Sequence, residues 1–220
     1  GCVVSGWGAA NDRVKGLEAG LDLEMPSSNG YNDGKIVKAV QDGVLEEAVL
    51  DEAVERILKV VFAYADHRHP EAVFDRDRDH EKAAEFAAEG AVLLENDGVL
   101  PLAEGQRIAY IGEFAAKPRY QGGGSSHINA SRVVSAVDAA SAKGRVFAYA
   151  KGFSAERDEM SEEELQEALR TASEADVAVV FAGLPDVFES ESYDRSSMKL
   201  PECQNRLIEE VLKVQPRVVV

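Results

Sequence analysis

The 220-residue sequence has little of what builds metal or disulfide frameworks: it holds two cysteines, Cys2 and Cys203, and one tryptophan. Neither cysteine belongs to a CxxC pair or another set with metal-ligand spacing, which argues against a zinc site. Two isolated cysteines do not form a disulfide framework either. We interpret both as ordinary thiols, and we expect a reducing, cytoplasmic location.

Positive charge is also scarce, with 24 basic residues against 40 acidic ones and a net charge of −16. This balance disfavours the phosphate backbone of nucleic acid and anionic membrane surfaces as partners. No apolar run approaches the length of a transmembrane helix. We therefore expect no nucleic acid and no membrane among the partners, and we interpret most of the charge as a solvated acidic surface.

The first 65 residues alternate short apolar strands with helical periodicity. Residues 2–5 and 21–25 are predicted strands, and residues 10–19 between them have helical character. Asp33 can cap a helix that runs to about Gln41. Residues 46–64 repeat apolar side chains at the spacing of an amphipathic helix. The pattern is strand, helix, strand, helices.

A charged stretch, residues 66–79, separates this block from the rest of the chain, and we interpret it as a solvated linker. It contains His67, Arg68, His69 and Pro70. A metal site here is the less favoured alternative, because no acidic or cysteine ligands are spaced to complete it.

The remaining residues, 80–220, alternate helices and strands. Helices are predicted at 80–90, 161–174 and 202–214, the second of them opening with a capping box at Ser161 and Glu164. Strands are predicted at 91–96, 107–112, 146–150, 176–182 and 217–220, and a tight turn at 96–98. Such alternation favours a parallel sheet, so the predicted fold class is α/β. Because the sequence opens and closes inside predicted strands, we expect it to be a segment of a longer protein.

Three places could carry chemistry, and the first is Ser5-Gly6-Trp7-Gly8 at the end of the first strand. Functional residues of (β/α)8 barrels lie at the carboxyl ends of strands. Trp7 is the sole tryptophan, and an indole face can stack on the C–H face of a sugar. A half-buried aromatic side chain that covers the strand end is an equally good interpretation from these residues alone.

The second place is the acidic segment 189–195, which follows the predicted strand 176–182 at the edge where α/β sheets bind ligands. Glu189 and Glu191 alternate along an extended loop, so we expect them to point to opposite sides. A retaining glycosidase needs two carboxyls about 5–5.5 Å apart, which these two cannot supply together. Without further context, an acidic surface loop is the favoured interpretation.

The third place is the glycine-rich run 120–127. It lacks the lysine of a phosphate-binding GxxxxGK[ST] loop and does not fit GxGxxG, so nucleotide binding is weakly supported. Glycines that let the backbone approach a neutral ligand or a partner domain are the better explanation. A flexible surface loop is the alternative, and His127 alone indicates structure rather than catalysis.

Taken in order, these segments resemble glycoside hydrolase family 3, the β-glucosidase family, along nearly the whole chain. The resemblance rests on Val4-Ser5-x-Trp7-Gly8, Gly16-Leu17-Glu18-Ala19-Gly20-Leu21-Asp22-Leu23-Glu24-Met25-Pro26, Leu50-Asp51-Glu52-Ala53-Val54-x-Arg56-Ile57-Leu58, Leu93-Leu94-Glu95-Asn96-Asp97-Gly98-x-Leu100-Pro101-Leu102 and Glu189-x-Glu191-x-x-Asp194-Arg195. Each motif alone is weak, and their joint order is specific.

The resemblance implies that residues 1–65 are the last two strand-helix units of a (β/α)8 barrel and that residues 80–220 begin an α/β sandwich domain. In this family the active site lies between those two domains. The resemblance maps the acid/base to Glu191, followed here by Ser192 in place of the usual glycine, and places Trp7 in the sugar pocket. It implies no cofactor and no metal, and a β-glucoside or oligosaccharide substrate.

Two departures from the family pattern matter. The family's nucleophilic aspartate corresponds to Gly6, so formation of a glycosyl-enzyme cannot start, and a loss of roughly 10⁴–10⁶ in rate is expected. The first six barrel units are also absent, and two units cannot close a barrel. The remainder of the polypeptide is thus an expected partner, and the exposed strand edges make a homo-oligomer possible.

Three functional hypotheses follow. The leading one is a segment of a retaining exo-acting β-glucosidase, inactivated at Gly6 by an engineered or selected change. The second is a natural, non-catalytic glucoside-binding protein, which would bind glucosides without turnover even after the aspartate is restored. The third is a nucleotide-binding α/β module, which the missing lysine and the negative charge disfavour.

Overall fold

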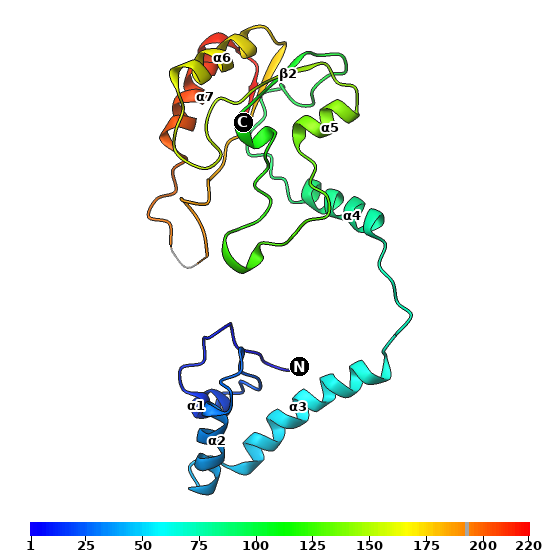
Figure 1. Cartoon of the computed structure of the whole chain (residues 1–220), viewed down its shortest axis with the longest axis vertical. Coiled ribbons are helices and arrows are strands. Elements are labelled where there is room, and N and C mark those ends of the chain that lie inside the picture. The colour runs from blue at the N-terminus through cyan, green and yellow to red at the C-terminus, as the bar shows by residue number, and fades with distance from the viewer. Residues whose placement is uncertain (192–193) are drawn as a thin grey trace. The chain divides into compact units, whose positions relative to one another are not determined.

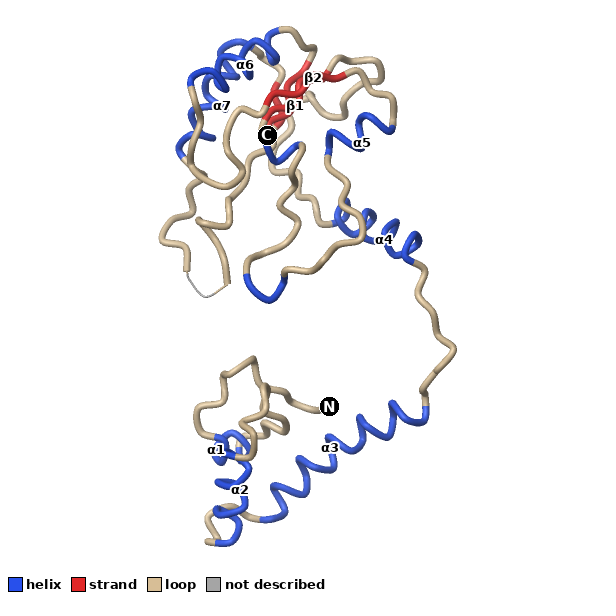
Figure 2. Tube along the Cα trace, viewed as in Figure 1, coloured by secondary structure: helices blue, strands red, loops and turns tan. Residues whose placement is uncertain are grey.

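The computed structural model describes residues 1–191 and 194–220, and they divide into two compact units, Gly1–Ala91 and Val92–Val220. Figure 1 shows the elements of each along the chain, and Figure 2 separates helices, strands and loops. Each unit is described by itself. Within the described ranges, none of the helices combines the length and apolar character needed to cross a bilayer.

The first unit contains four helices, and the first three of them surround a small apolar core. Its helices are α1 (Arg13–Glu18), α2 (Tyr31–Gln41), α3 (Glu47–Asp66) and α4 (Arg76–Glu89). The core side chains are Leu17, Ile36, Ala39, Leu45 and Ala53. Of the apolar positions predicted along α3, only Ala53 is buried. Val60, Val61 and Tyr64 are exposed.

Several predictions for this unit need correction. The expected strands 2–5 and 21–25 are reduced to one parallel bridge between Val4 and Leu23, because no neighbouring strand among the described residues extends the ladder. Asp33, predicted to cap a helix, lies instead within the first turn of α2. The N-cap residue is Gly30, whose backbone is in the left-handed conformation. Helix α4 begins at Arg76, inside the expected linker, because the Asp75 carboxylate accepts hydrogen bonds from the N–H groups of Asp77 and Arg78.

The second unit is built on a parallel sheet in the order β2-β1-β3-β4. Its strands are β1 (Ile108–Ile111), β2 (Phe147–Ala150), β3 (Val177–Val180) and β4 (Val218–Val219). Ile108 pairs with both Phe147 and Val177, and Ala178 pairs with Val218. The predicted α/β class and these four strands are confirmed.

Helices cover both faces of this sheet. They are α5 (Ala136–Ala142), α6 (Glu162–Ser173) and α7 (Glu202–Val214). Figure 1 shows α6 and α7 on one side of the strands and α5 on the other. The core between α6, α7 and the sheet is formed by Ala109, Ile111, Ala150, Phe153, Leu165, Ala168, Ala172, Ala178, Val180, Leu207 and Val211.

The predicted helices over 161–174 and 202–214 are confirmed, including the capping box at Ser161 and Glu164. The expected strand at 91–96 is wrong: these residues form no ladder, and Val92 and Leu94 are highly exposed. An apolar run becomes a strand only beside a strand that takes up its backbone groups. The turn at 96–98 is confirmed, since Asn96 Oδ1 accepts from the N–H groups of Gly98 and Leu100.

The order of the strands defines where a ligand site is expected. The chain leaves β1 toward α5 on one face and leaves β3 toward α7 on the other, and β1 and β3 are neighbours. Loops that leave adjacent strands toward opposite faces open a crevice at the carboxyl edge of the sheet. The segments that meet this condition are residues 112–135 after β1 and residues 181–201 after β3.

Candidate functional site

In the first unit, Gly6 and Trp7 follow the bridge between Val4 and Leu23, and the backbone on both sides of them is anchored. The Ser5 N–H donates to the Leu23 carbonyl (2.9 Å), and the Gly8 N–H donates to the Met25 carbonyl (2.8 Å). The Ser5 hydroxyl accepts from the Met25 N–H (2.8 Å). The predicted position of both residues at a strand end therefore corresponds to a defined turn.

Nothing in the backbone requires a glycine at position 6. Its φ lies outside the left-handed region that favours glycine, and a Cβ placed there would lie 3.6 Å from Ala9 Cβ, an ordinary van der Waals distance. Trp7 is 77% exposed, so its indole is accessible to a ligand in this unit.

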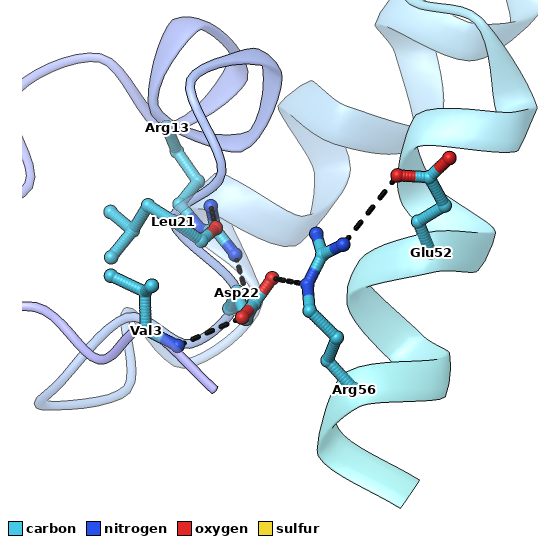
Figure 3. Close-up of polar contacts among 6 residues, drawn as sticks. All are labelled: Val3, Arg13, Leu21, Asp22, Glu52 and Arg56. Atoms are coloured by element: carbon cyan, nitrogen blue, oxygen red, sulfur yellow. Dashed lines mark hydrogen bonds and ion pairs between the residues drawn. The ribbon is translucent and has the colours of Figure 1, made fainter. Parts of the chain in front are cut away.

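A buried polar network supports this strand end (Figure 3). The Asp22 carboxylate accepts from the Val3 N–H (2.8 Å) and from Arg56 Nε (2.9 Å), which comes from α3. Arg13 of α1 donates to the carbonyls of Leu21 and Asp22, each at 2.8 Å. The Val3 N–H and the Arg56 guanidinium hold the pKa of Asp22 below its usual value. Nothing local in the sequence indicates this network, because its hydrogen-bonded partners lie up to 34 residues apart.

In the second unit, Glu191 lies in the loop after β3 and is bound by the glycine-rich segment after β1. Its Oε2 accepts from the Ser125 N–H (2.8 Å) and from the Ser125 hydroxyl (3.0 Å). These two donors, the backbone N–H first, lower the pKa of Glu191. The two segments are the loops that follow the neighbouring strands β1 and β3.

Glu189, the other acidic residue of this loop, has different partners. Arg119 Nη1 donates to Glu189 Oε2 (2.9 Å), and Arg119 Nη2 donates to the Glu189 carbonyl (2.9 Å). Arg119 Nε also pairs with Asp186 (2.6 Å). Glu189 is thus held by a fixed positive charge, whereas the two bonds that Glu191 accepts come from neutral donors.

The glycines of the 120–127 run allow the two loops to approach closely. A Cβ on Gly123 would overlap the Ser190 side chain, and a Cβ on Gly124 would overlap the Glu191 carboxylate. Gly124 also has a φ of +75°. The structure sets Gly123 and Gly124 against the loop of Glu191. A role of the run in binding a neutral ligand or a partner domain stays a prediction.

The predicted site residues therefore fall into two groups: Gly6 and Trp7 in the first unit, and Glu191 in the second. The acidic segment extends through Ser192 and Tyr193, which lie outside the described residues. Across residues 1–191 and 194–220, no group of three or more His, Cys, Asp or Glu side chains is arranged to hold a metal ion. The sequence analysis also missed Arg119, because nothing local signals its pairing with residues about 70 positions away.

Comparison with known proteins identifies the family. Residues 91–220 match the glycosyl hydrolase family 3 C-terminal domain. The whole chain is 52% identical, over 224 residues, to thermostable beta-glucosidase B of Acetivibrio thermocellus, of which it spans 30%. It is 40% identical, over 236 residues, to an exo-alpha-(1->6)-L-arabinopyranosidase of Bifidobacterium longum, again spanning 30% of that relative.

Solved structures agree with this assignment. The GH3 beta-glucosidase of Bifidobacterium adolescentis superposes with a TM-score of 0.88 at 40% identity, over 99% of this chain and 32% of that one. Beta-glucosidase 3B of Thermotoga neapolitana, in complex with alpha-D-glucose, gives a TM-score of 0.75 at 28% identity, over 97% of this chain and 34% of that one. The chain spans about a third of the length of these relatives. It belongs to glycosyl hydrolase family 3, and residues 91–220 match the C-terminal domain of that family.

Proposed function

We propose that the chain is a segment of a retaining, exo-acting β-glycosidase of the β-glucosidase type, which removes terminal β-D-glucosyl residues and is disarmed at Gly6. Glu191 is the acid/base in this proposal, and Trp7 stacks on the sugar. Residues 1–65 correspond to the end of the (β/α)8 barrel. The observation that carries the proposal is the contrast between the two glutamates of one loop: Glu189 accepts from the charged Arg119, and Glu191 accepts from the neutral Ser125.

This contrast favours Glu191 as the residue that moves protons. A carboxyl used as acid and then as base must change its protonation state in each cycle. A guanidinium in direct contact opposes protonation of its partner by its charge. Neutral donors oppose protonation less, because they bring no charge, so Glu191 is the better suited of the two.

The space at position 6 supports the assignment of Gly6 as a lost nucleophile. A glycine is required where the backbone is left-handed or where neighbours exclude a Cβ, and neither holds at Gly6. An aspartate there would attack the anomeric carbon and form a glycosyl-enzyme while Glu191 protonates the leaving oxygen. Glu191 would then take a proton from water as the water oxygen attacks the anomeric carbon. This attack breaks the bond to the aspartate and releases the sugar with retained configuration.

The glucosyl specificity rests on the relative that is 52% identical and named a beta-glucosidase. Another relative, at 40% identity, is named an arabinopyranosidase. Hydrolysis of an arabinopyranoside should therefore be compared with hydrolysis of a glucoside. The proposed reaction needs no metal or cofactor. Its partners are the glycoside and the remainder of the polypeptide, and a cytoplasmic location is part of the proposal.

A natural, non-catalytic glucoside-binding protein is the second candidate. The same Gly6 favours it, since loss of the nucleophile removes turnover without removing Trp7 from the strand end. In that case the sugar is held and not cleaved. The two candidates differ in what an aspartate at position 6 does.

The test introduces Gly6→Asp into the full-length protein that contains this chain and measures hydrolysis of an aryl β-glucoside. We expect turnover to rise by about 10⁴-fold or more over the Gly6 protein. Glu191→Gln in the Gly6→Asp background should suppress it, whereas Glu189→Gln should reduce it less. A Gly6→Asp protein that binds glucosides and stays inert would establish the binding protein and remove the catalytic role of Glu191.

A further inference from the structure

The glycine-rich loop after β1 contacts Glu191 in the loop after β3 through Ser125. We propose that this loop is a carboxylate seat, in which Ser125 positions Glu191 and Gly123 and Gly124 make the close approach possible. This inference rests on the proposed function, because it assigns a task to residues around the proposed acid/base. Ser125 is a positioning residue in it and does not touch the substrate.

The seat is specific because both donors of Ser125 reach one atom. The N–H and the hydroxyl lie 2.8 and 3.0 Å from Glu191 Oε2, so they fix the position of that oxygen. Neither bond involves Glu191 Oε1. One oxygen of the carboxyl is thus held by the protein while the hydrogen bonds to Ser125 leave its other oxygen unused, which suits a group that exchanges a proton with a substrate.

The seat needs two glycines in succession. Side chains on Gly123 or Gly124 would occupy the space of the Ser190 and Glu191 side chains. Gly122, next to them, differs: a Cβ there would approach only the Ser126 hydroxyl, at 3.3 Å, and its φ is not left-handed. The close approach therefore constrains the second and third glycines of the run more than the first.

Arg119 forms a second tie between the same two loops. It donates to the carbonyl of Glu189, two residues before Glu191, and it pairs with the side chains of Glu189 and Asp186. Its side chain is 21% exposed, so these bonds are partly shielded from water. Arg119 fixes the backbone of the loop, and Ser125 fixes the carboxylate that the loop carries.

The seat also tunes the protonation of Glu191. Hydrogen bonds to a carboxylate favour its charged form, so Ser125 holds the pKa of Glu191 below its usual value. Arg119 pairs with both Asp186 and Glu189, and Lys117 pairs with Glu113. The other charged or titratable groups among the described residues of these loops are Tyr120, His127, Arg132, Asp194, Arg195 and Lys199. Loss of the Ser125 hydroxyl should therefore raise the Glu191 pKa.

The first test uses the 220-residue chain itself and is independent of activity. Carbon-13 NMR of labelled glutamate carboxyls gives the Glu191 pKa, with Glu191→Gln identifying the signal. We expect Ser125→Ala and Gly124→Ala to raise this pKa and Ser125→Thr to leave it unchanged. Gly105→Ala is the matched control for the backbone, because Gly105 has a φ of +79° with open space around it. An unchanged Glu191 pKa in both Ser125→Ala and Gly124→Ala would overturn the seat.

The second test uses the full-length protein with Gly6→Asp and measures kcat, KM and the pH profile. Ser125→Ala should lower kcat by about 10- to 100-fold with little change in KM, as expected for a displaced catalytic group. It should also move the basic limb of the kcat/KM profile to higher pH, which reports the acid in the free enzyme. An unchanged kcat and profile would overturn the positioning role. Failure of Gly6→Asp to give any turnover would instead count against the proposed function, and the NMR result would stand.

Discussion

The side-chain amide of Gln204 makes two hydrogen bonds to the backbone of Gly183, donating to its carbonyl oxygen (2.8 Å) and accepting from its N–H (2.9 Å). Gln204 belongs to α7 and is completely buried. Gly183 begins the loop that carries Glu189 and Glu191. This pairing fixes the loop near its start, whereas Arg119 holds it at Glu189 and Ser125 holds it at Glu191.

Gln204→Leu should therefore destabilise the second unit by about 1–3 kcal/mol, because it leaves the two Gly183 groups without their partner while it keeps the side-chain volume. Hydrogen exchange of the β3 amides measures the effect in this unit alone. Gln166→Leu is the control, since Gln166 lies on the exposed side of α6 and donates to the exposed Glu162 side chain. Equal protection in the two variants would contradict the role of Gln204.

Gly112, at the end of β1, should not tolerate a side chain. A Cβ there would lie 2.6 Å from the Phe181 carbonyl oxygen and 2.9 Å from the Phe153 ring, at a φ of +107°. We expect Gly112→Ala to cost about 2–5 kcal/mol through overlap and backbone strain together. Gly98→Ala is the matched control, because Gly98 has a φ of +103° and open space around it. Exchange of the β1 amides should rise far more in Gly112→Ala than in Gly98→Ala.

Local signals predicted the second unit well. The capping box at Ser161 and Glu164 and the apolar run 176–182 specify α6 and β3 through contacts within a few residues. The same kind of signal at Ser135 and Asp138 caps α5, which the sequence analysis did not predict although the motif was present. Short-range hydrogen bonds are readable from sequence because their partners are three residues apart.

Long-range partners were not readable. The pairing of Arg119 with Glu189 and the binding of Glu191 by Ser125 join residues more than 60 positions apart. The strand order likewise pairs residues that are distant in sequence, such as Ile108 with Val177. An arginine or serine in a loop has many possible partners, and only the sheet topology selects one. The resemblance singled out Glu191, and the sequence alone offered no reason to prefer it to Glu189.

The stability of the first unit should depend on the ionisation of Asp22. The pKa of Asp22 is lowered in the folded state, chiefly by the Val3 N–H and then by Arg56. The Asp22 carboxylate thus contributes fully to the stability of the first unit above its unfolded-state pKa of about 3.9. This contribution is lost as the pH falls through the lower pKa of the folded state. Asp22→Asn should lower the free energy of unfolding of the first unit at neutral pH. It should also make that free energy depend less on pH below about 3.9.

Urea titrations followed by the amide NMR signals of Val3 and Arg56 measure this dependence between pH 2 and 7. Asp42→Asn is the control, because Asp42 pairs with Lys38 on the exposed surface of the first unit. It should change the urea midpoint little at any pH. If the urea midpoint changes with pH in the same way in the unmodified chain and in Asp22→Asn, the Asp22 carboxylate does not govern acid unfolding.

The thiol of Cys203 should be unreactive in the folded chain. Burial, together with the neighbouring Asp158 carboxylate, raises its pKa to about 12. Asp158 accepts from the N–H groups of Glu202 and Cys203, so it occupies the N-terminus of α7, where a helix would otherwise favour a thiolate. Compared with an ordinary thiol of pKa about 8.5, the thiolate fraction at pH 8 is lower by about 10³.

A Cys2→Ser chain leaves Cys203 as the single cysteine, and alkylation by iodoacetamide at pH 8 reports it alone. Part of the lost thiolate is offset by the greater nucleophilicity of a high-pKa thiolate. We therefore expect the folded chain to react about 10- to 100-fold more slowly than the same chain unfolded in guanidinium. Asp158→Asn should accelerate the reaction of the folded chain, because the carboxylate that disfavours the thiolate is gone. Equal rates in the folded and unfolded chains would mean that neither burial nor Asp158 suppresses the thiolate.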